Sequence, residues 1–304
     1  MRVWVDAFEG LVEALEGLGI EAFEGLGKAL EGFGIAFEGR VEPLSRVWEE
    51  FHMRNIAVKV SYDGARFNGF QSQLEPHLRT VQQEIEKALR ALTGEEIHII
   101  GSGRTDAGVH AMGQVFNFHT ESVIPAERWA IALNTRLPKD IVILEAYEVP
   151  EQFHSRRSAK RKTYRYSIDR GKFPDVFTRH YCFHYPMRLN AEAMAEALPY
   201  LIGEHDFTSF TSIHSTKPHH IRTIYEAYFE QQGSKLHMYV TGNGFLYNMV
   251  RVIMGTLLWV GQGKLKPEDM KRILEGKSRS LAGPTAMPHG LTLVEVEYPD
   301  ELRS

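Results

Sequence analysis

From residue 54 onward, the order of apolar and polar positions predicts strands and helices that follow one another along the chain. Single residues separate the apolar residues Ile56, Val58 and Val60, and this spacing is typical of a half-buried strand. Thr80 is a suitable N-cap for a helix, because apolar residues then recur at spacings of three and four up to residue 92. Further strands are predicted at 97–101, 114–119 and 141–149, with a helix after Pro125.

The second half of the chain repeats this style. The pattern predicts a strand at 162–168, a helix at 190–202, strands near 222–230 and 235–240, a helix from 245, a short helix after Pro267 and a closing strand at 291–298. Strands and helices interleave without a strict strand–helix–strand rhythm. We therefore predict an α+β fold with a mixed, largely antiparallel sheet.

The first 40 residues follow a different pattern. The tetrapeptide Ala-Phe/Leu-Glu-Gly begins at residues 7, 14, 22, 29 and 36, so large apolar side chains recur at spacings of mostly three and four. This spacing favours an amphipathic helix or a coiled-coil seam. However, the stretch contains eight Gly, each of which destabilises a helix interior by about 1 kcal/mol relative to Ala. We interpret 1–52 as a repetitive Gly- and Glu-rich extension without a catalytic role.

Composition and charge narrow the class of protein. With 43% hydrophobic and 24% charged residues, and no apolar run long enough for a membrane span, the chain is typical of a soluble globular protein. Cys182 is the single cysteine, which fits a reducing cytoplasm. Residues 1–52 hold 4 Lys and Arg against 11 Asp and Glu, whereas 53–304 hold 31 against 28. The body of the protein is therefore mildly basic, which is compatible with a nucleic-acid partner.

The most specific chemistry lies at 101–111, Gly-Ser-Gly-Arg-Thr-Asp-Ala-Gly-Val-His-Ala, between two predicted strands. Its three glycines permit tight turns and the close approach of a ligand. Asp106 lies two residues from Arg104, whose charge would favour the ionised carboxylate. An ionised Asp in such a loop is a candidate nucleophile or general base. The alternative is an Asx-type turn that the Asp106 side chain closes, with Arg104 as a solvated neighbour.

A basic run with aromatic residues follows at 153–170, where seven Lys and Arg surround Tyr164 and Tyr166. Single-stranded RNA needs such a surface, because cations bind phosphates and rings stack on unpaired bases. In a strand, Tyr164, Tyr166 and Ile168 would share one face. The alternative interpretation is a solvated basic edge strand.

The predicted helix after residue 245 is apolar on most sides and contains Arg251. Such a helix is buried, and a buried guanidinium requires a carboxylate partner. Alternatively, Arg251 emerges on a narrow polar strip with Asn248 and Thr256. His180, Cys182 and His184 would share one face of a strand, but no fourth ligand is in view, and we expect no metal site there.

The string at 103–111 resembles the signature of the tRNA pseudouridine synthase A family. The resemblance runs in family order from about Met53 to Tyr298. It includes Ser61-Tyr-Asp-Gly64, Phe70-Gln71, Thr80-Val-Gln82, Lys162-Thr-Tyr-Arg-Tyr166, Gly203-Glu-His-Asp-Phe207, Gly242-Asn-Gly-Phe-Leu-Tyr-Asn-Met-Val-Arg251 and Gly290-Leu291. One departure is Met287, at a position where relatives often have Pro.

The resemblance implies an isomerase that converts uridine to pseudouridine at positions 38–40 of the tRNA anticodon stem-loop, without a cofactor or metal. It implies that Asp106 is the nucleophile, attacking either C6 or C1′, and that Arg251 pairs with it. Tyr164 would stack on the target uracil, and Arg104 would help to hold the opened site and bind phosphate.

The family fold implies two similar α/β halves, 53–155 and 156–304, which share one sheet with the active cleft between them. A homodimer that binds tRNA is also implied, and we expect cytoplasmic residence. The competing function is a non-catalytic RNA-binding protein that uses the same basic and aromatic surface and does not need Asp106.

We predict that a chain beginning at Met53 folds, dimerises and modifies tRNA as well as the full chain does, because every matched motif follows that residue. The removed segment is acidic, and its charge would repel RNA rather than attract it. Size-exclusion chromatography and a tRNA modification assay on both chains test this. Aggregation of the shorter chain, or loss of its dimer, would mean that the apolar stripe between Phe8 and Phe37 is a docked structural element.

Overall fold

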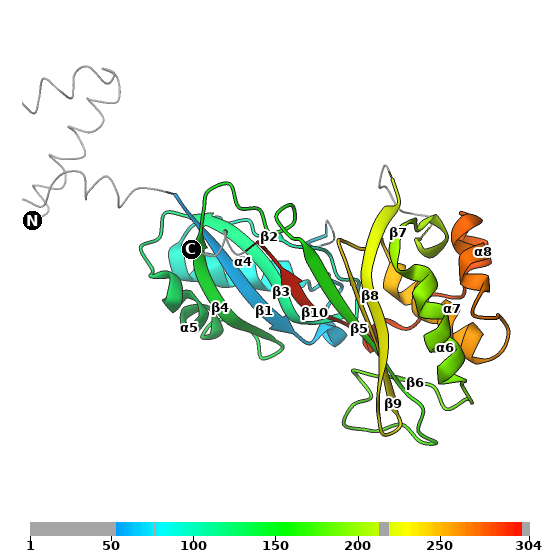
Figure 1. Ribbon diagram of the computed structural model, residues 1–304. Coiled ribbons are helices and arrows are strands. Elements are labelled where there is room, and N and C mark those ends of the chain that lie inside the picture. Colours follow the sequence, from blue (N-terminus) through cyan, green and yellow to red (C-terminus); the bar gives the residue numbers. More distant parts are fainter. Residues whose placement is uncertain (1–52, 74, 76, 213–218, 300–304) are drawn as a thin grey trace, which may run out of the picture. The chain divides into compact units, whose positions relative to one another are not determined.

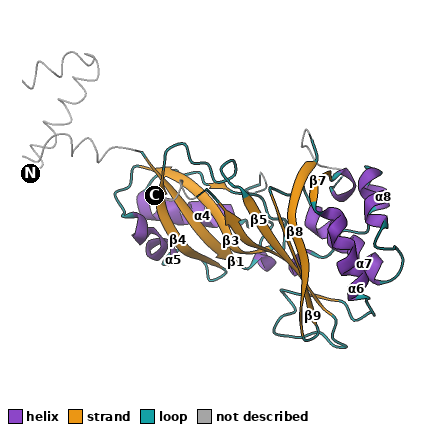
Figure 2. Cartoon of the chain, viewed as in Figure 1, coloured by secondary structure: helices purple, strands orange, loops and turns teal. Residues whose placement is uncertain are grey.

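The computed structural model describes residues 53–73, 75, 77–212 and 219–299, so the predicted extension at 1–52 lies outside the described residues. The described strands form one ten-stranded sheet (Figure 1). Its main order is β4-β1-β3-β10-β5-β9-β8-β7, with β2 paired to β3 and β6 paired to β5. Helices pack against this sheet, so the α+β prediction is confirmed (Figure 2).

The first part of the sheet is built around β1 (Arg54–Tyr62), which pairs antiparallel with β3 (His110–Thr120) and β4 (Ile141–Val149). The two-residue strand β2 (Ile100–Gly101) pairs with β3. Helices α4 (Val81–Thr93) and α5 (Trp129–Asn134) cover one face of these strands (Figure 1). Thr80 caps α4 through a reciprocal capping box with Gln83, as its position before the apolar run predicted.

The second part is built around β5 (Arg161–Asp169). This strand pairs antiparallel with β9 (Lys235–Gly242) and β10 (Leu291–Glu297), and parallel with β6 (Phe183–His184). Strands β8 (Ile221–Gln232) and β7 (Gly203–Asp206) extend the sheet, and helices α6 (Ala191–Ala197), α7 (Met249–Gly261) and α8 (Asp269–Glu275) pack together beside it (Figure 2). No helix among the described residues has both the length and the apolar character needed to cross a bilayer.

The two parts share one strand arrangement, in which the first strand of the part lies between its last strand and a middle strand. In the first part, β1 lies between β4 and β3; in the second, β5 lies between β10 and β9. Apart from the β3–β10 and β5–β6 pairings, the strand pairs are antiparallel, so the predicted mixed and mostly antiparallel sheet is confirmed. The boundary between halves near residue 155 stays a prediction.

The last strand of the chain joins the two parts. Strand β10 lies between β3 and β5, pairing parallel with β3 only at Thr292–His110 and Leu293–Ala111. It pairs antiparallel with β5 over a longer stretch. This seam between β3, β10 and β5 brings the start of β3, and the loop before it, close to β5.

Some predicted bounds differ from those observed. Helix α7 begins at Met249 instead of 245, because Asn248 has a left-handed φ of 61° that no helix continues. Strand β2 has two residues where 97–101 was predicted, and the short strand β7 carried no alternation that predicted it.

Candidate active site

The loop at 102–109 joins β2 to β3 and carries Asp106. Neighbouring strands hold its first residues: Gln114 Nε2 donates to Gly103 O (3.0 Å), and Lys162 Nζ on β5 donates to Ser102 O. These two bonds connect the loop to both sides of the seam. Its position therefore depends on the packing of the whole sheet.

Residues of the earlier motifs support the middle of the loop. Phe70 N donates to Thr105 O (3.1 Å), and the hydroxyls of Thr105 and Tyr62 lie 2.8 Å apart in a buried contact. Gly69 has φ 96°, and a Cβ built there would lie 2.8 Å from Thr105 O. A side chain at Gly69 would therefore strain its own backbone and displace the loop.

The end of the loop is anchored by His110, a residue that the sequence patterns do not single out. Gly64 N donates to His110 Nδ1 (3.0 Å), and a Cβ on Gly64 would lie 2.0 Å from Val109 O. Burial lowers the pKa of His110 and outweighs the opposite effect of Asp63, so the ring that accepts this bond is neutral. The available signal was a histidine four residues after Asp106 in the same motif.

The backbone turns sharply after Asp106, whose carbonyl accepts from Val109 N (3.1 Å). Gly108 has φ 78°, the conformation that a type II turn needs at its third residue. The side chain of Asp106 does not close an Asx-type turn, because it contacts Arg251 instead.

Arg251 on α7 donates through Nη1 to Asp106 Oδ2 (2.9 Å), so the predicted contact between these residues is present. Nη1 also donates to Asn248 Oδ1 (2.8 Å), and Nε donates to Ala286 O (2.8 Å). The left-handed backbone of Asn248 turns its side chain to Arg251 rather than to the helix N-terminus. The guanidinium is thus fixed from three directions and points at one carboxylate.

Arg104 was expected to hold the Asp106 carboxylate ionised, and this expectation is wrong. The guanidinium that contacts Asp106 is that of Arg251, while Arg104 is exposed and lines a separate pocket with Arg156. Closeness in sequence does not fix side-chain contacts, and the guanidinium that reaches Asp106 comes from α7, 145 residues further along the chain.

The Asp106 side chain is only 20% exposed, and that of Arg251 is 15% exposed. Burial raises the pKa of Asp106 above its usual value, and the hydrogen bond and charge of Arg251 oppose that rise. The folded state therefore holds a carboxylate with little water around it and one fixed counter-charge.

Tyr164 on β5 lies between Leu293 of β10 and Val240 of β9 in the sheet register. Its ring and that of Phe245 meet edge to face with centroids 5.1 Å apart, and only 8% of the residue is exposed. Burial is the main cause that raises the pKa of Tyr164, and the charges of Tyr62 and Asp106 add to that rise. Tyr164 is therefore a neutral phenol near Asp106.

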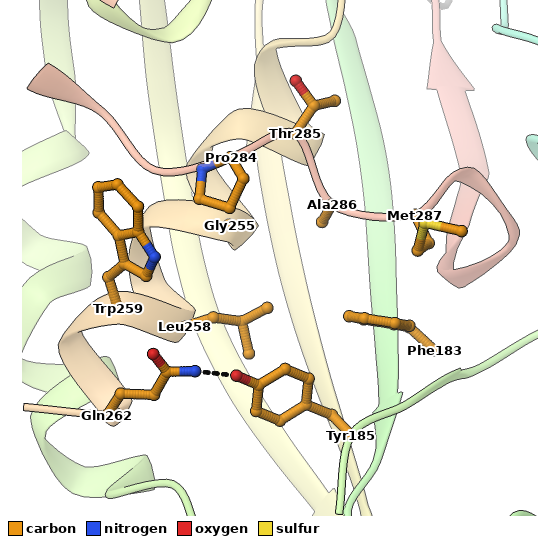
Figure 3. Close-up of a pocket in the computed structure, with 10 residues that line it drawn as sticks. All are labelled: Phe183, Tyr185, Gly255, Leu258, Trp259, Gln262, Pro284, Thr285, Ala286 and Met287. Atoms are coloured by element: carbon orange, nitrogen blue, oxygen red, sulfur yellow. Dashed lines mark hydrogen bonds between the residues drawn. The ribbon is translucent and has the colours of Figure 1, made fainter. Parts of the chain in front are cut away.

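The segment at 284–287 lines an apolar pocket beside α7 (Figure 3), and the carbonyl of its Ala286 accepts from Arg251. Its backbone approaches the helix so closely that a Cβ on Gly255 would lie 1.7 Å from Pro284 O. Met287, the departure from relatives, has φ −61°, which a Pro would also adopt, and its carbonyl accepts from the Tyr166 hydroxyl (2.7 Å). The loop shape is therefore compatible with either residue.

The three soft ligands at 180–184 do not share a strand face, because β6 contains only Phe183 and His184. His184 Nε2 lies 2.9 Å from Gly171 O, and Cys182 is buried. Within the described ranges, no group of three His, Cys, Asp or Glu side chains is arranged to hold a metal.

Comparison with known proteins identifies what this chain resembles as a whole. Residues 58–156 and 197–299 match the model of the tRNA pseudouridine synthase family. The tRNA pseudouridine synthase A of Anoxybacillus flavithermus is 51% identical over 247 residues, which cover 81% of this chain and 99% of that protein. The protein of the same name from Bacillus subtilis is 51% identical over 79% of this chain and 97% of its own length. That of Caldicellulosiruptor bescii is 48% identical over 81% and 100%.

We predict that Gly255→Ala destabilises the protein by about 3 kcal/mol, at the upper end of what overpacking usually costs, because the new Cβ meets backbone that cannot shift freely. The matched control is Gly261→Ala in the same helix, where the Cβ would meet the flexible Met194 side chain. We expect a loss of about 1 kcal/mol there. Urea denaturation of both variants measures the difference, and equal losses would contradict this account of the contact.

Proposed function

We propose that Asp106 is the nucleophile of this chain. The chain belongs to the tRNA pseudouridine synthase A family and is an isomerase that converts uridine to pseudouridine in tRNA. The observation that carries the proposal is the pairing of Asp106 with Arg251 at the seam of the sheet. The carboxylate is partly desolvated, so a positioned cation is needed to keep it ionised. An ionised and poorly hydrated carboxylate is a competent nucleophile.

The reaction breaks the N1–C1′ bond of the uridine, turns the base and forms a C5–C1′ bond, while C5 loses its proton to solvent and N1 takes one up, so the product is an isomer of the substrate. Asp106 attacks either C6 of the base or C1′ of the ribose in this proposal, and both attacks conserve atoms and charge. Among the described residues, Arg251 is the one counter-charge of the Asp106 carboxylate, and its hydrogen bonds to that carboxylate and to Ala286 O fix the orientation of the pair. The neutral Tyr164 provides a ring for the uracil to stack on.

The substrate must present an unstacked uridine, which requires less free energy in a loop than in a duplex. Exposed cations that follow the first half of the sheet, at Arg156, Arg157, Lys160 and Arg161, are suited to the RNA backbone. We further propose that the targets are uridines 38–40 of the anticodon arm and that Arg104 binds phosphate. A homodimer in the cytoplasm is the expected working form.

We predict that Asp106→Asn abolishes pseudouridine formation while tRNA affinity stays within about tenfold of the wild-type value, or about 1.4 kcal/mol. The substitution removes the nucleophile and keeps the shape of the side chain. Tritium release from tRNA labelled at uridine C5 measures turnover, and a filter-binding titration measures affinity. Substantial turnover by the variant would remove Asp106 as the nucleophile. Binding without turnover by the wild-type protein would support the non-catalytic alternative.

We predict that Arg251→Gln moves the acid limb of the single-turnover rate to higher pH. The attack needs the carboxylate, so the rate falls as pH drops through the folded-state pKa of Asp106. Arg251 lowers that pKa, and its removal lets burial raise it further. The control Arg251→Lys keeps a charge and should move the limb less, although it loses the planar fork.

The same variant tests the linkage between protonation and stability. A raised carboxyl pKa favours the protonated folded state, so ionised Asp106 destabilises the fold above its unfolded pKa. Arg251→Gln should therefore lose about 3 kcal/mol at neutral pH, and this loss should shrink as pH falls toward the pKa of Asp106. A deficit that does not vary with pH would mean that Arg251 acts through packing alone.

A further inference from the structure

Beside the Asp106 loop lies a second pocket of about 180 Å³, and Arg104, proposed above to bind phosphate, is one of its lining residues. The lining side chains come from three segments: the 70–82 stretch before and into α4, the β2 segment with the start of the loop, and the turn after β4. The residues are Phe70, Gln71, Gln82, Ile99, Ile100, Gly101, Arg104, His154 and Arg156. The pocket therefore shares Gly101 and Arg104 with the segment that leads to Asp106.

The turn that carries Arg156 is rigid. Ser155 is fully buried, its N donates to Asn117 Oδ1 (2.9 Å), and its hydroxyl donates to Ile100 O. The Tyr298 hydroxyl in turn donates to Ser155 O (2.6 Å). Arg156 is thus presented to the pocket by backbone that does not need a ligand to order it.

Two guanidiniums, those of Arg104 and Arg156, line the pocket close enough for their charges to repel each other. Although Arg156 is exposed as a whole residue, partial burial of its guanidinium lowers its pKa, and the charge of Arg104 lowers it further. Among the residues that the structure describes, neither arginine has a carboxylate within ion-pair distance. Glu86, on the same helix as Gln82, accepts from Gln82 Nε2 (2.7 Å) and Ile99 N (3.1 Å) and does not line the pocket.

His154 adds a third donor. Its Nδ1 accepts from Arg156 N (3.2 Å) and Arg157 N (3.4 Å), which places the ring proton of the neutral form on Nε2. Burial and the charges of Arg157 and Arg156 lower its pKa, so the neutral form persists. The charged groups of the lining are thus both cations, and the histidine beside them is a donor.

We propose that this pocket binds one phosphodiester of the RNA backbone next to the target uridine, held between Arg104 and Arg156 with His154 beside them. The inference rests on the proposed function, because it takes the RNA that reacts at Asp106 as the ligand. A phosphate supplies the missing negative charge between two guanidiniums and accepts from planar N–H donors. Since Arg104 is two residues from Asp106, the phosphate belongs to the target nucleotide or to a direct neighbour.

The consequence is that substrate binding and loop geometry are connected. A phosphate held by Arg104 fixes the same loop that carries Asp106, and it removes the repulsion between the two arginines. Arg156 is a binding residue in this account, and it carries no step of the chemistry.

The experiment compares Arg156→Gln with Arg157→Gln, which removes the same charge from the next residue of the same run but not from the pocket. Binding of an anticodon stem-loop RNA is measured over a range of salt concentrations. The RNA is then resynthesised with single neutral methylphosphonate linkages on either side of the target uridine. We expect Arg156→Gln to weaken binding by about tenfold to a hundredfold and to flatten the logarithmic salt slope by about 0.7–0.9.

The decisive result is the combination of both changes. One methylphosphonate should weaken binding to the wild-type protein and to Arg157→Gln, yet cause no further loss with Arg156→Gln, since the contact is already missing. Additive losses in all three proteins would overturn the pocket as the phosphate site. So would wild-type binding by Arg156→Gln. An abasic neighbour that weakens binding where the methylphosphonate does not would assign the pocket to a base instead.

Two controls keep these outcomes interpretable. Arg156→Lys retains a charge in the pocket and should recover part of the affinity if Arg156→Gln is folded. Tritium release by the wild-type protein tests the proposed function separately. An active wild-type protein with an unaffected Arg156→Gln variant would therefore overturn only this inference.

Discussion

The structure depends on one contact between distant parts of the chain, the hydrogen-bonded ion pair of Asp106 and Arg251, which are 145 residues apart. A carboxylate that is only 20% exposed needs a partner, and a guanidinium on a largely buried helix needs one as well. Each residue therefore resolves the electrostatic problem of the other. The loop before β3 and the start of α7 must meet for this to happen, and strand β10 between β3 and β5 makes that meeting part of the sheet.

Close backbone approaches on both sides hold the pair in place. On the side of the carboxylate, Gly69 leaves room for Thr105 O, and Gly64 leaves room for Val109 O. On the side of the guanidinium, Gly255 lets the 284–287 segment reach α7, so that Ala286 O can accept from Arg251. These three glycines are thus spacers between segments rather than flexible points. This explains why motifs scattered over the chain act on a single loop.

The same loop borders two environments of opposite charge, one that holds a carboxylate and one that holds two arginines. At Asp106, a negative charge is held in a nearly dry site by one cation. At Arg104, two cations face a pocket in which no described carboxylate pairs with either of them. In the proposed complex, the phosphate of the substrate occupies that pocket and completes the electrostatics of the loop, so that charge pairs hold the loop on both sides of Asp106.

Local patterns in the sequence determined the strands around Ile56 and Tyr164, the capped helix after Thr80 and the need of Arg251 for a carboxylate. These follow from side-chain periodicity and from the free energy of burying a charge, which act within a few residues. The family resemblance named Asp106 as that partner. Only the tertiary structure decided that Arg104 lines a pocket with Arg156, that Asn248 before α7 accepts from Arg251, that His110 anchors the loop and that β10 closes the seam. Each of these depends on which distant segments pack together, and such contacts leave no periodic trace in the chain.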